Sequence, residues 1–158
     1  MKAASVQEIK QQLQGLSSSK LSELCLRLAK FKKDNKELLT YLLFESDDET
    51  AYIANVKKDI DAGFEGLPKP NVYLTKKSLR KVLRATLRQI RYSDSTTTEV
   101  ELLIYFLRKI QDTGIPLQNS TVLTNLYRQQ LKKVQSALAG LHEDLQYDYQ
   151  RDLKKLEI

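Results

Sequence analysis

The sequence contains little cysteine, tryptophan, proline or glycine: one, none, three and five residues, respectively. A single cysteine excludes an internal disulfide framework, and no cysteine and histidine spacing typical of a zinc site is present. No apolar run approaches the roughly 18 residues of a membrane span, and residues 1–10 lack the apolar core of a signal peptide. From these absences we expect a cytoplasmic protein with no membrane span, no metal site and no cofactor.

The residues that are abundant favour helices, because Leu, Lys, Gln, Glu and Ala are all good helix formers. No segment alternates apolar and polar residues over the length of a strand. We therefore predict an all-α fold of six or seven helices. It would be a stack of αα-hairpins of the HEAT or armadillo kind or an irregular helical bundle. Because a chain of this length encloses one core, we expect a single domain over residues 1–158.

Capping residues and the spacing of apolar residues predict where the helices begin and end. The predicted helices cover about residues 5–15, 19–33, 34–44, 46–63, 75–92, 96–114 and 119–156. Residues 65–74, which include two prolines, are predicted to form a loop that could join sub-units 1–64 and 75–158. The last helix would be long, about 55 Å at a rise of about 1.5 Å per residue, unless Gly140 interrupts it.

Two leucine-rich segments indicate how the helices could be arranged. Residues 34–44 are apolar around most of a helical circumference, so we expect that helix to be central in the fold. Residues 37–44 also match residues 101–108 at five of eight positions, which is a weak indication of an internal repeat. In the last helix, apolar residues at alternating steps of three and four resemble a coiled-coil seam, compatible with packing on the same chain or with a helical dimer. The seam comprises Leu131, Val134, Leu138, Leu141 and Leu145.

Positive charge is concentrated in one segment. The chain has 26 Lys and Arg against 20 Asp and Glu, and residues 67–93 hold eight of the basic residues and no acidic one. On a helical wheel with about 100° per residue, seven of these cations fall within an arc of about 140°. We call these seven residues the basic stripe: Lys76, Lys77, Arg80, Lys81, Arg84, Arg88 and Arg91.

The basic stripe calls for a physical explanation, because like charges four residues apart weaken a helix by a few tenths of a kcal/mol per pair. One hypothesis is a phosphate-bearing partner, with Tyr73 and Tyr92 stacking on bases beside the cations. A second is an acidic protein or an anionic membrane surface. The third is an ordinary solvated face, or internal pairing with the acidic segment 47–65, which holds Asp47, Asp48, Glu49, Asp59, Asp61 and Glu65.

Other candidate sites have weaker support. His142, the only histidine, has no second metal ligand three or four residues away, and the acidic row Asp144, Asp148 and Asp152 does not include it. Cys25 lies in an apolar stripe, where a thiol behaves as a small hydrophobic group. No glycine-rich phosphate loop, nucleophile elbow or HExxH motif is present. A carboxylate-dependent enzyme remains a separate hypothesis for the function of the protein, because such active sites leave no linear motif in the sequence.

The sequence therefore predicts a non-catalytic helical scaffold, a monomer or a helical dimer, that binds a macromolecular partner, with a protein favoured as that partner. The alternative is a nucleic-acid-binding protein that uses the helix 75–92. Its predicted phosphate contacts are Lys77, Arg80, Lys81, Arg84, Arg88 and Arg91. The scaffold and the nucleic-acid hypotheses differ in what they require of the basic stripe. Only nucleic-acid binding requires exposed cations with no carboxylate beside them.

Overall fold

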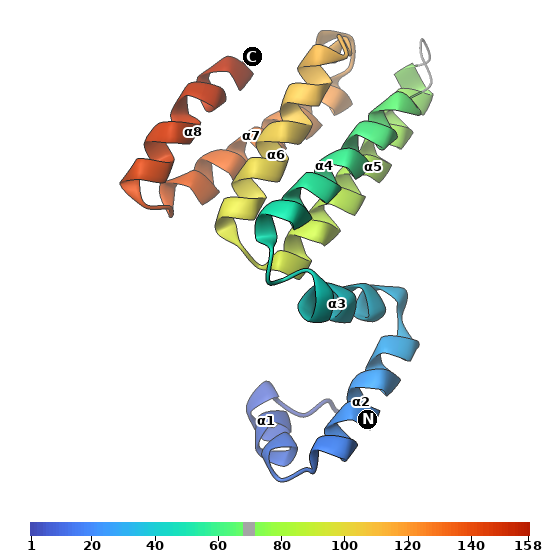
Figure 1. Ribbon diagram of the computed structural model, residues 1–158. Helices are drawn as coiled ribbons and strands as arrows, with labels where there is room; N and C mark the ends of the chain where they lie inside the picture. The colour runs from blue at the N-terminus through green and yellow to red at the C-terminus, as the bar shows by residue number, and fades with distance from the viewer. Residues whose placement is uncertain (68–71) are drawn as a thin grey trace. The chain divides into compact units, whose positions relative to one another are not determined.

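A computed structural model describes residues 1–67 and 72–158 and confirms the all-α prediction over that part of the chain (Figure 1). These residues form eight α-helices and one short 3₁₀ helix. The α-helices are α1 (Val6–Gln14), α2 (Ser18–Phe31), α3 (Lys33–Phe44), α4 (Glu49–Glu65), α5 (Val72–Ser93), α6 (Thr96–Asp112), α7 (Thr121–Ala139) and α8 (Glu143–Leu156). The 3₁₀ helix, η1, spans Leu117–Asn119.

The chain divides into two compact units, Met1–Phe44 and Glu45–Ile158. The division comes before α4, whereas the predicted loop 65–74 lies inside the second unit. Helix α4 continues to Glu65 and α5 begins at Val72, so both helices extend into the segment that was predicted to be a loop. Residues 68–71 of the predicted loop lie outside the described residues.

The first unit consists of α1, α2 and α3, and its main contact is between α2 and α3. The Asn35 side-chain amide donates to the Leu28 carbonyl at 2.8 Å and ties the two helices together where they meet. Tyr41 is the one buried hydrophobic residue of this unit, while Phe31 and Phe44 are largely exposed. The expectation that helix 34–44 is central is therefore wrong, because within its unit only α2 packs along it.

Cys25 is likewise exposed and does not lie in a buried stripe. It is on α2, whose apolar residues gather on one side of the helix although none of them is buried in the structure. Amphipathic spacing therefore located the apolar face of this helix, but the spacing does not establish that the face is covered.

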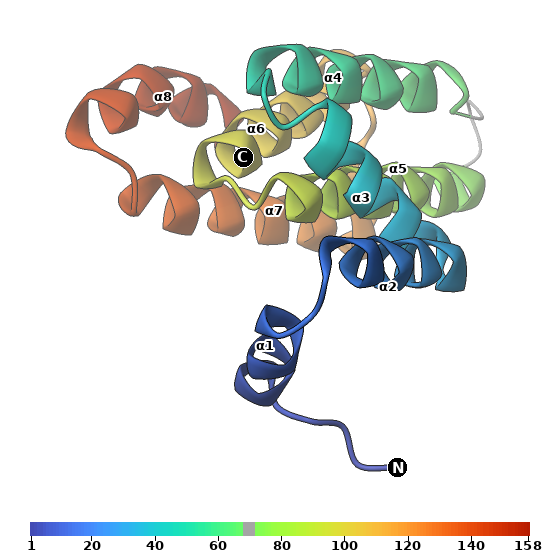
Figure 2. The ribbon, with the colours of Figure 1, turned by 60° about the horizontal axis from the view of Figure 1, so that its bottom comes forward.

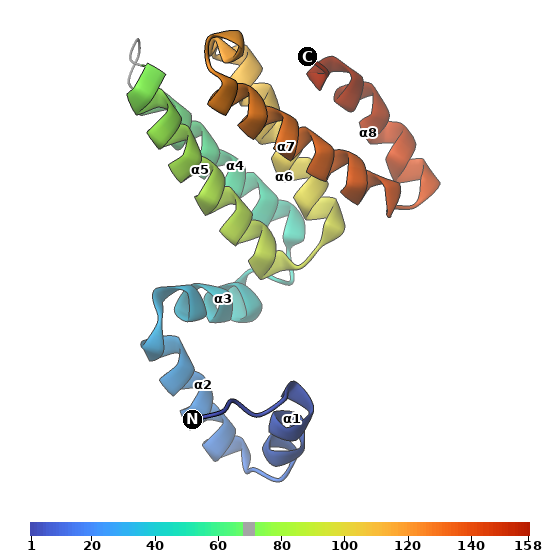
Figure 3. The ribbon, with the colours of Figure 1, turned by 180° about the vertical axis from the view of Figure 1, so that it is seen from behind.

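The second unit is organised around α6, which contacts α4, α5, α7 and α8. Figures 1 and 3 view these helices from opposite sides, and Figure 2 shows α4 on one side of α6 and α7 on the other. The buried residues of α6 cover about two thirds of the helix circumference at about 100° per residue: Thr98, Val100, Leu102, Leu103, Ile104, Phe106, Leu107 and Ile110. The prediction of an apolar helix over 96–114 is confirmed, and this helix is the central one.

The C-terminal region forms two helices, so of the two alternatives left open for residues 119–156 the structure shows the interruption at Gly140. Helix α7 ends at Ala139 with Gly140 as its C-cap, and His142 caps α8 by accepting from the Asp144 backbone N–H at 3.4 Å. This break raises the helix count in the described part of the chain to eight. It also ends the apolar seam: Leu131, Val134 and Leu138 are buried before the break.

The repeat architecture is not shown by the structure. The two matching segments lie in different surroundings, since Tyr41 alone is buried in the first, whereas most of the second is in the core of the second unit. What the structure does show is an all-α fold in which α4 to α8 pack as a bundle.

A buried tyrosine holds α8 on α7. The Tyr127 hydroxyl donates to the carbonyl of Leu156 at 2.8 Å, and both residues are almost completely buried. Burial raises the pKa of Tyr127 to about 12, compared with about 10 in an unfolded chain.

We therefore expect the free energy of unfolding to fall as the pH rises from 10 to 12. In that range the unfolded chain loses the Tyr127 proton while the folded chain keeps it, at a cost of up to about 3 kcal/mol. Urea unfolding from pH 9 to 12 measures this decline, which should be smaller in Tyr127→Phe. Tyr147→Phe, at an exposed tyrosine of α8, is the control. Equal alkaline slopes in all three proteins would contradict the assignment.

Candidate anion-binding groove on α5

Helix α5 is fixed in the second unit by one apolar side. Leu79, Leu83, Thr86 and Ile90 are buried, and the helix packs on α4 and α6. The Tyr52 hydroxyl of α4 donates to the Gln89 carbonyl at 2.8 Å and adds a polar contact between α4 and α5. Because the apolar and basic arcs are mostly separate, this packing turns the basic stripe away from the core.

The structure exposes most of the basic stripe to solvent. Lys77, Arg80, Lys81, Arg84 and Arg91 are exposed, whereas Lys76 and Arg88 are half-buried. Within residues 1–67 and 72–158, no carboxylate forms an ion pair with Lys76, Lys77, Arg80, Lys81, Arg84 or Arg91. The described ion pairs therefore do not join these six cations to the acidic segment 47–65.

Several carboxylates of the acidic segment have other partners. Asp61 pairs with Lys109 of α6 at 2.8 Å and accepts from the Tyr105 hydroxyl at 2.8 Å. Asp48 is the N-cap of α4 and accepts from the Ala51 backbone N–H at 2.9 Å. Glu49 accepts hydrogen bonds from the hydroxyl groups of Ser93, at the end of α5, and Thr98, in the first turn of α6.

The pKa values of this network follow from its contacts. The hydrogen bond from Lys109 lowers the pKa of Asp61, and the same pair raises the pKa of Lys109. The pKa of Tyr105 is raised, first by burial and then by its hydrogen bond to Asp61. Each shift favours the charge state that keeps α4 attached to α6, so Asp61 is committed to packing rather than to the basic stripe.

Two more ion pairs belong to the same set of helix contacts. Lys57 of α4 pairs with Glu101 of α6 at 2.6 Å, and Arg108 of α6 pairs with Asp152 of α8 at 2.8 Å. Asp152 therefore has a structural partner that the acidic row 144–152 did not suggest. Among the described residues, no group of three or more His, Cys, Asp or Glu side chains has a geometry suited to a metal ion.

The exposed cations border a groove between α5 and the start of α7, with a volume of about 480 Å³. It is lined by Tyr73, Lys76, Lys77, Arg80, Leu83, Arg84, Leu87 and Val122. Among the described residues, this lining contains four cations and no carboxylate. Apolar side chains from both helices complete it, so the groove combines positive charge with an apolar surface. We call it the basic groove.

The structure brings together only part of the predicted site. Lys77, Arg80 and Arg84 line the basic groove, whereas Lys81 and Arg91 are exposed elsewhere on α5 and Arg88 is half-buried. Tyr73 is 72% exposed and lines the groove, but Tyr92 is only 8% exposed and cannot stack on a base as was predicted.

Sequence reasoning missed the apolar part of the groove. Leu87 lies at the edge of the basic arc, which was a signal that it would accompany the cations. Val122 gave no signal, because it comes from a helix that is far away in the sequence. Its place beside α5 is a consequence of how α5 and α7 are both held by α6 and its neighbours.

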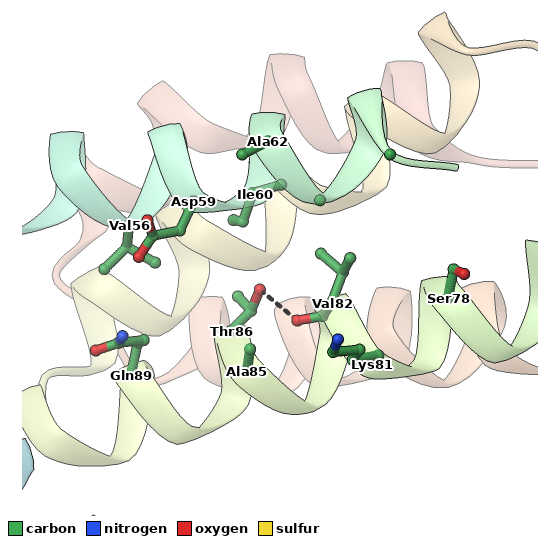
Figure 4. A pocket seen from close by; sticks show the side chains of 12 residues that line it. Val56, Asp59, Ile60, Ala62, Ser78, Lys81, Val82, Ala85, Thr86 and Gln89 are labelled. Atoms are coloured by element: carbon green, nitrogen blue, oxygen red, sulfur yellow. Dashed lines mark hydrogen bonds between the residues drawn. The ribbon is translucent and has the colours of Figure 1, made fainter. Parts of the chain in front are cut away.

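A second cavity, of about 350 Å³, lies between α4 and α5 (Figure 4). Asp59 and Lys81 are at its edge, and the Thr86 hydroxyl donates to the Val82 carbonyl of its own helix at 3.0 Å. The two helices come close beside it, since a Cβ on Gly63 would lie 2.5 Å from Val82 Cγ2. Among the described residues that line this cavity, Asp59 is the one carboxylate.

Comparison with protein-family models, curated protein sequences and solved structures found no match to this chain. In the described part of the chain, no helix combines the length and the apolar character that crossing a membrane requires.

The repulsion within the basic stripe should be measurable as a stability cost. We expect Arg84→Gln to stabilise the protein by roughly 0.5 kcal/mol at low salt, because it removes the repulsion of Arg84 with Arg80 and Arg88. Gln and Arg have similar helix propensities, so the substitution changes little else in the helix. The gain should disappear at high salt, where exposed charges are screened. Urea unfolding in about 20 mM and about 1 M salt measures both effects.

Lys58→Gln is the matched control, because Lys58 is an exposed cation of α4 outside the basic stripe. It should bring no gain at either salt concentration. A loss of stability in Arg84→Gln that does not depend on salt would show that Arg84 makes a stabilising contact.

Proposed function

We propose that this protein is a non-catalytic helical protein that binds nucleic acid through the basic groove and the adjoining part of the basic stripe. The observation that carries the proposal is the set of cations on α5 that are exposed, line a groove without carboxylates and have no ion-pair partner among the described residues. Six cations that form no ion pair within the described part of the chain repel one another at a cost to helix stability, and a polyanion would offset that cost.

The dimensions of the stripe suit an extended polyanion better than a single small anion. Lys77 and Arg91 are 14 residues apart, which corresponds to about 21 Å along a helix. Cations at steps of three and four residues can neutralise several phosphates in succession, and each neutralised phosphate releases condensed counterions. The binding free energy gained from each phosphate contact is small, and the total grows with the number of contacts.

An anionic membrane is a poorer partner for this helix. A helix that binds a membrane surface buries its apolar face among the lipids. The apolar face of α5 is instead buried in the protein, with Leu79 fully covered and Leu83 and Ile90 nearly so. Only the cations and the groove are available, which leaves electrostatic attraction without the insertion step.

A protein partner is the second candidate function, and the apolar part of the basic groove is the observation that favours it. Leu83, Leu87 and Val122 give the groove an apolar lining between two helices. An acidic amphipathic helix would place its apolar face there and its carboxylates on the cations. This partner would make the protein a helical scaffold.

Fluorescence anisotropy of labelled DNA and RNA across a salt series tests the first candidate. We expect log affinity to fall linearly with log salt, by about 0.7–0.9 per neutralised phosphate. Replacing Lys77, Arg80 and Arg84 together by Gln should reduce this slope by about 2 and weaken binding at least roughly tenfold at low salt. Circular dichroism would check that each variant is folded.

The matched control replaces Arg151, Lys154 and Lys155 of α8 by Gln. It removes the same number of exposed cations, and α8 packs on α6 and α7 rather than on α5. Equal losses in both triple variants would show attraction to net charge alone. Absence of salt-dependent binding by the folded wild type, together with binding of an acidic helical peptide, would favour the protein partner.

A further inference from the structure

We infer that the basic groove takes single-stranded nucleic acid rather than a duplex, with Tyr73 stacking on a base. This inference rests on the proposed function and concerns the same site. Its starting observation is that the groove has two chemistries side by side: four cations and an apolar lining that includes an exposed aromatic ring.

A duplex makes poor use of such a groove. Its outer surface carries the phosphates, while the faces of its bases are stacked inside. An apolar hollow pressed against a phosphate backbone would remove water from charged oxygens without giving them hydrogen bonds, and this is costly. A flat surface of cations would serve a duplex equally well, so the apolar lining would have no part in binding.

A single strand presents both of the chemistries that the groove can recognise. Its bases have exposed faces that stack on aromatic and apolar side chains, and its phosphates alternate with those bases along the chain. Leu83, Leu87 and Val122 can receive a base, while Lys77 and Arg80 hold the neighbouring phosphates. The volume of about 480 Å³ is within the usual range for pockets that bind small organic groups.

Tyr73 is placed to provide the stacking surface. Its side chain is 72% exposed although it lines the groove, so one side of the ring is accessible from solvent. It comes three and four residues before Lys76 and Lys77, which puts the ring and the two ammonium groups on the same face of α5. A base on the ring would have its phosphates within reach of both lysines.

The test compares a 20-nucleotide single-stranded DNA, the RNA of the same sequence and the corresponding duplex by anisotropy, in strands long enough to cover roughly one binding site. Wild type should bind at least one single strand about tenfold more tightly than the duplex. Tyr73→Leu should weaken single-strand binding about tenfold, as expected for loss of one stacked base, and leave duplex binding unchanged. Tyr73→Phe, which keeps the ring, should retain the wild-type affinity.

Tyr147→Leu is the control, because Tyr147 is a similarly exposed tyrosine on α8. Salt-dependent binding with equal or higher affinity for the duplex would overturn this inference while leaving the proposed function in place. So would identical single-strand affinities for Tyr73→Leu and Tyr147→Leu. Absence of salt-dependent binding to all three nucleic acids would overturn both proposals.

Discussion

The burial of α6 is the constraint on which the second unit depends. Buried side chains, nearly all of them apolar, cover about two thirds of the circumference of this helix, so they are shielded from water only if several other helices pack around it. Helices α4, α5, α7 and α8 do so. Phe106 illustrates the result, since it is fully buried and meets the ring of Phe64 from α4 edge to face, with the ring centroids 5.6 Å apart. The positions of α5 and α7, and therefore the basic groove between them, follow from their packing in this bundle.

The same packing determines which cations the carboxylates of the second unit pair with. Carboxylates of α4, α6 and α8 form ion pairs that join those three helices, as in the pairs Asp61–Lys109, Lys57–Glu101 and Arg108–Asp152. These pairs are partly exposed, so each contributes little stability, but each carboxylate in them pairs with a cation of α4 or α6 rather than with one of α5. The separation of charge is thus a property of the helix contacts. It leaves most of the basic stripe without compensation among the described residues, and this is the physical basis of the proposed binding.

Local signals in the sequence predicted individual helices well and their surroundings less well. Ser5 and Glu8 form a capping box at the start of the helix predicted over 5–15, and the apolar helix predicted over 96–114 is the core helix of the second unit. The helix 34–44 has a similar composition but buries only Tyr41, because the chain divides into two units just after it. Gly140 was recognised as a point of interruption, yet whether a glycine ends a helix depends on what the following residues can pack against. Here α8 turns back onto α6 and α7, and the Tyr127 hydrogen bond to Leu156 holds it there.

The sequence by itself determined that the protein is helical and that one helix carries a continuous arc of cations, because both properties depend only on residues within a few positions of each other. Tertiary structure decided which of those cations act together. It buried Tyr92, left Tyr73 exposed at the groove and brought Val122 from α7 to complete the apolar lining. It also paired Asp61 with Lys109 of α6 rather than with a cation of the basic stripe. These outcomes require contacts between helices distant in the chain, and the periodicity of a single helix holds no information about them.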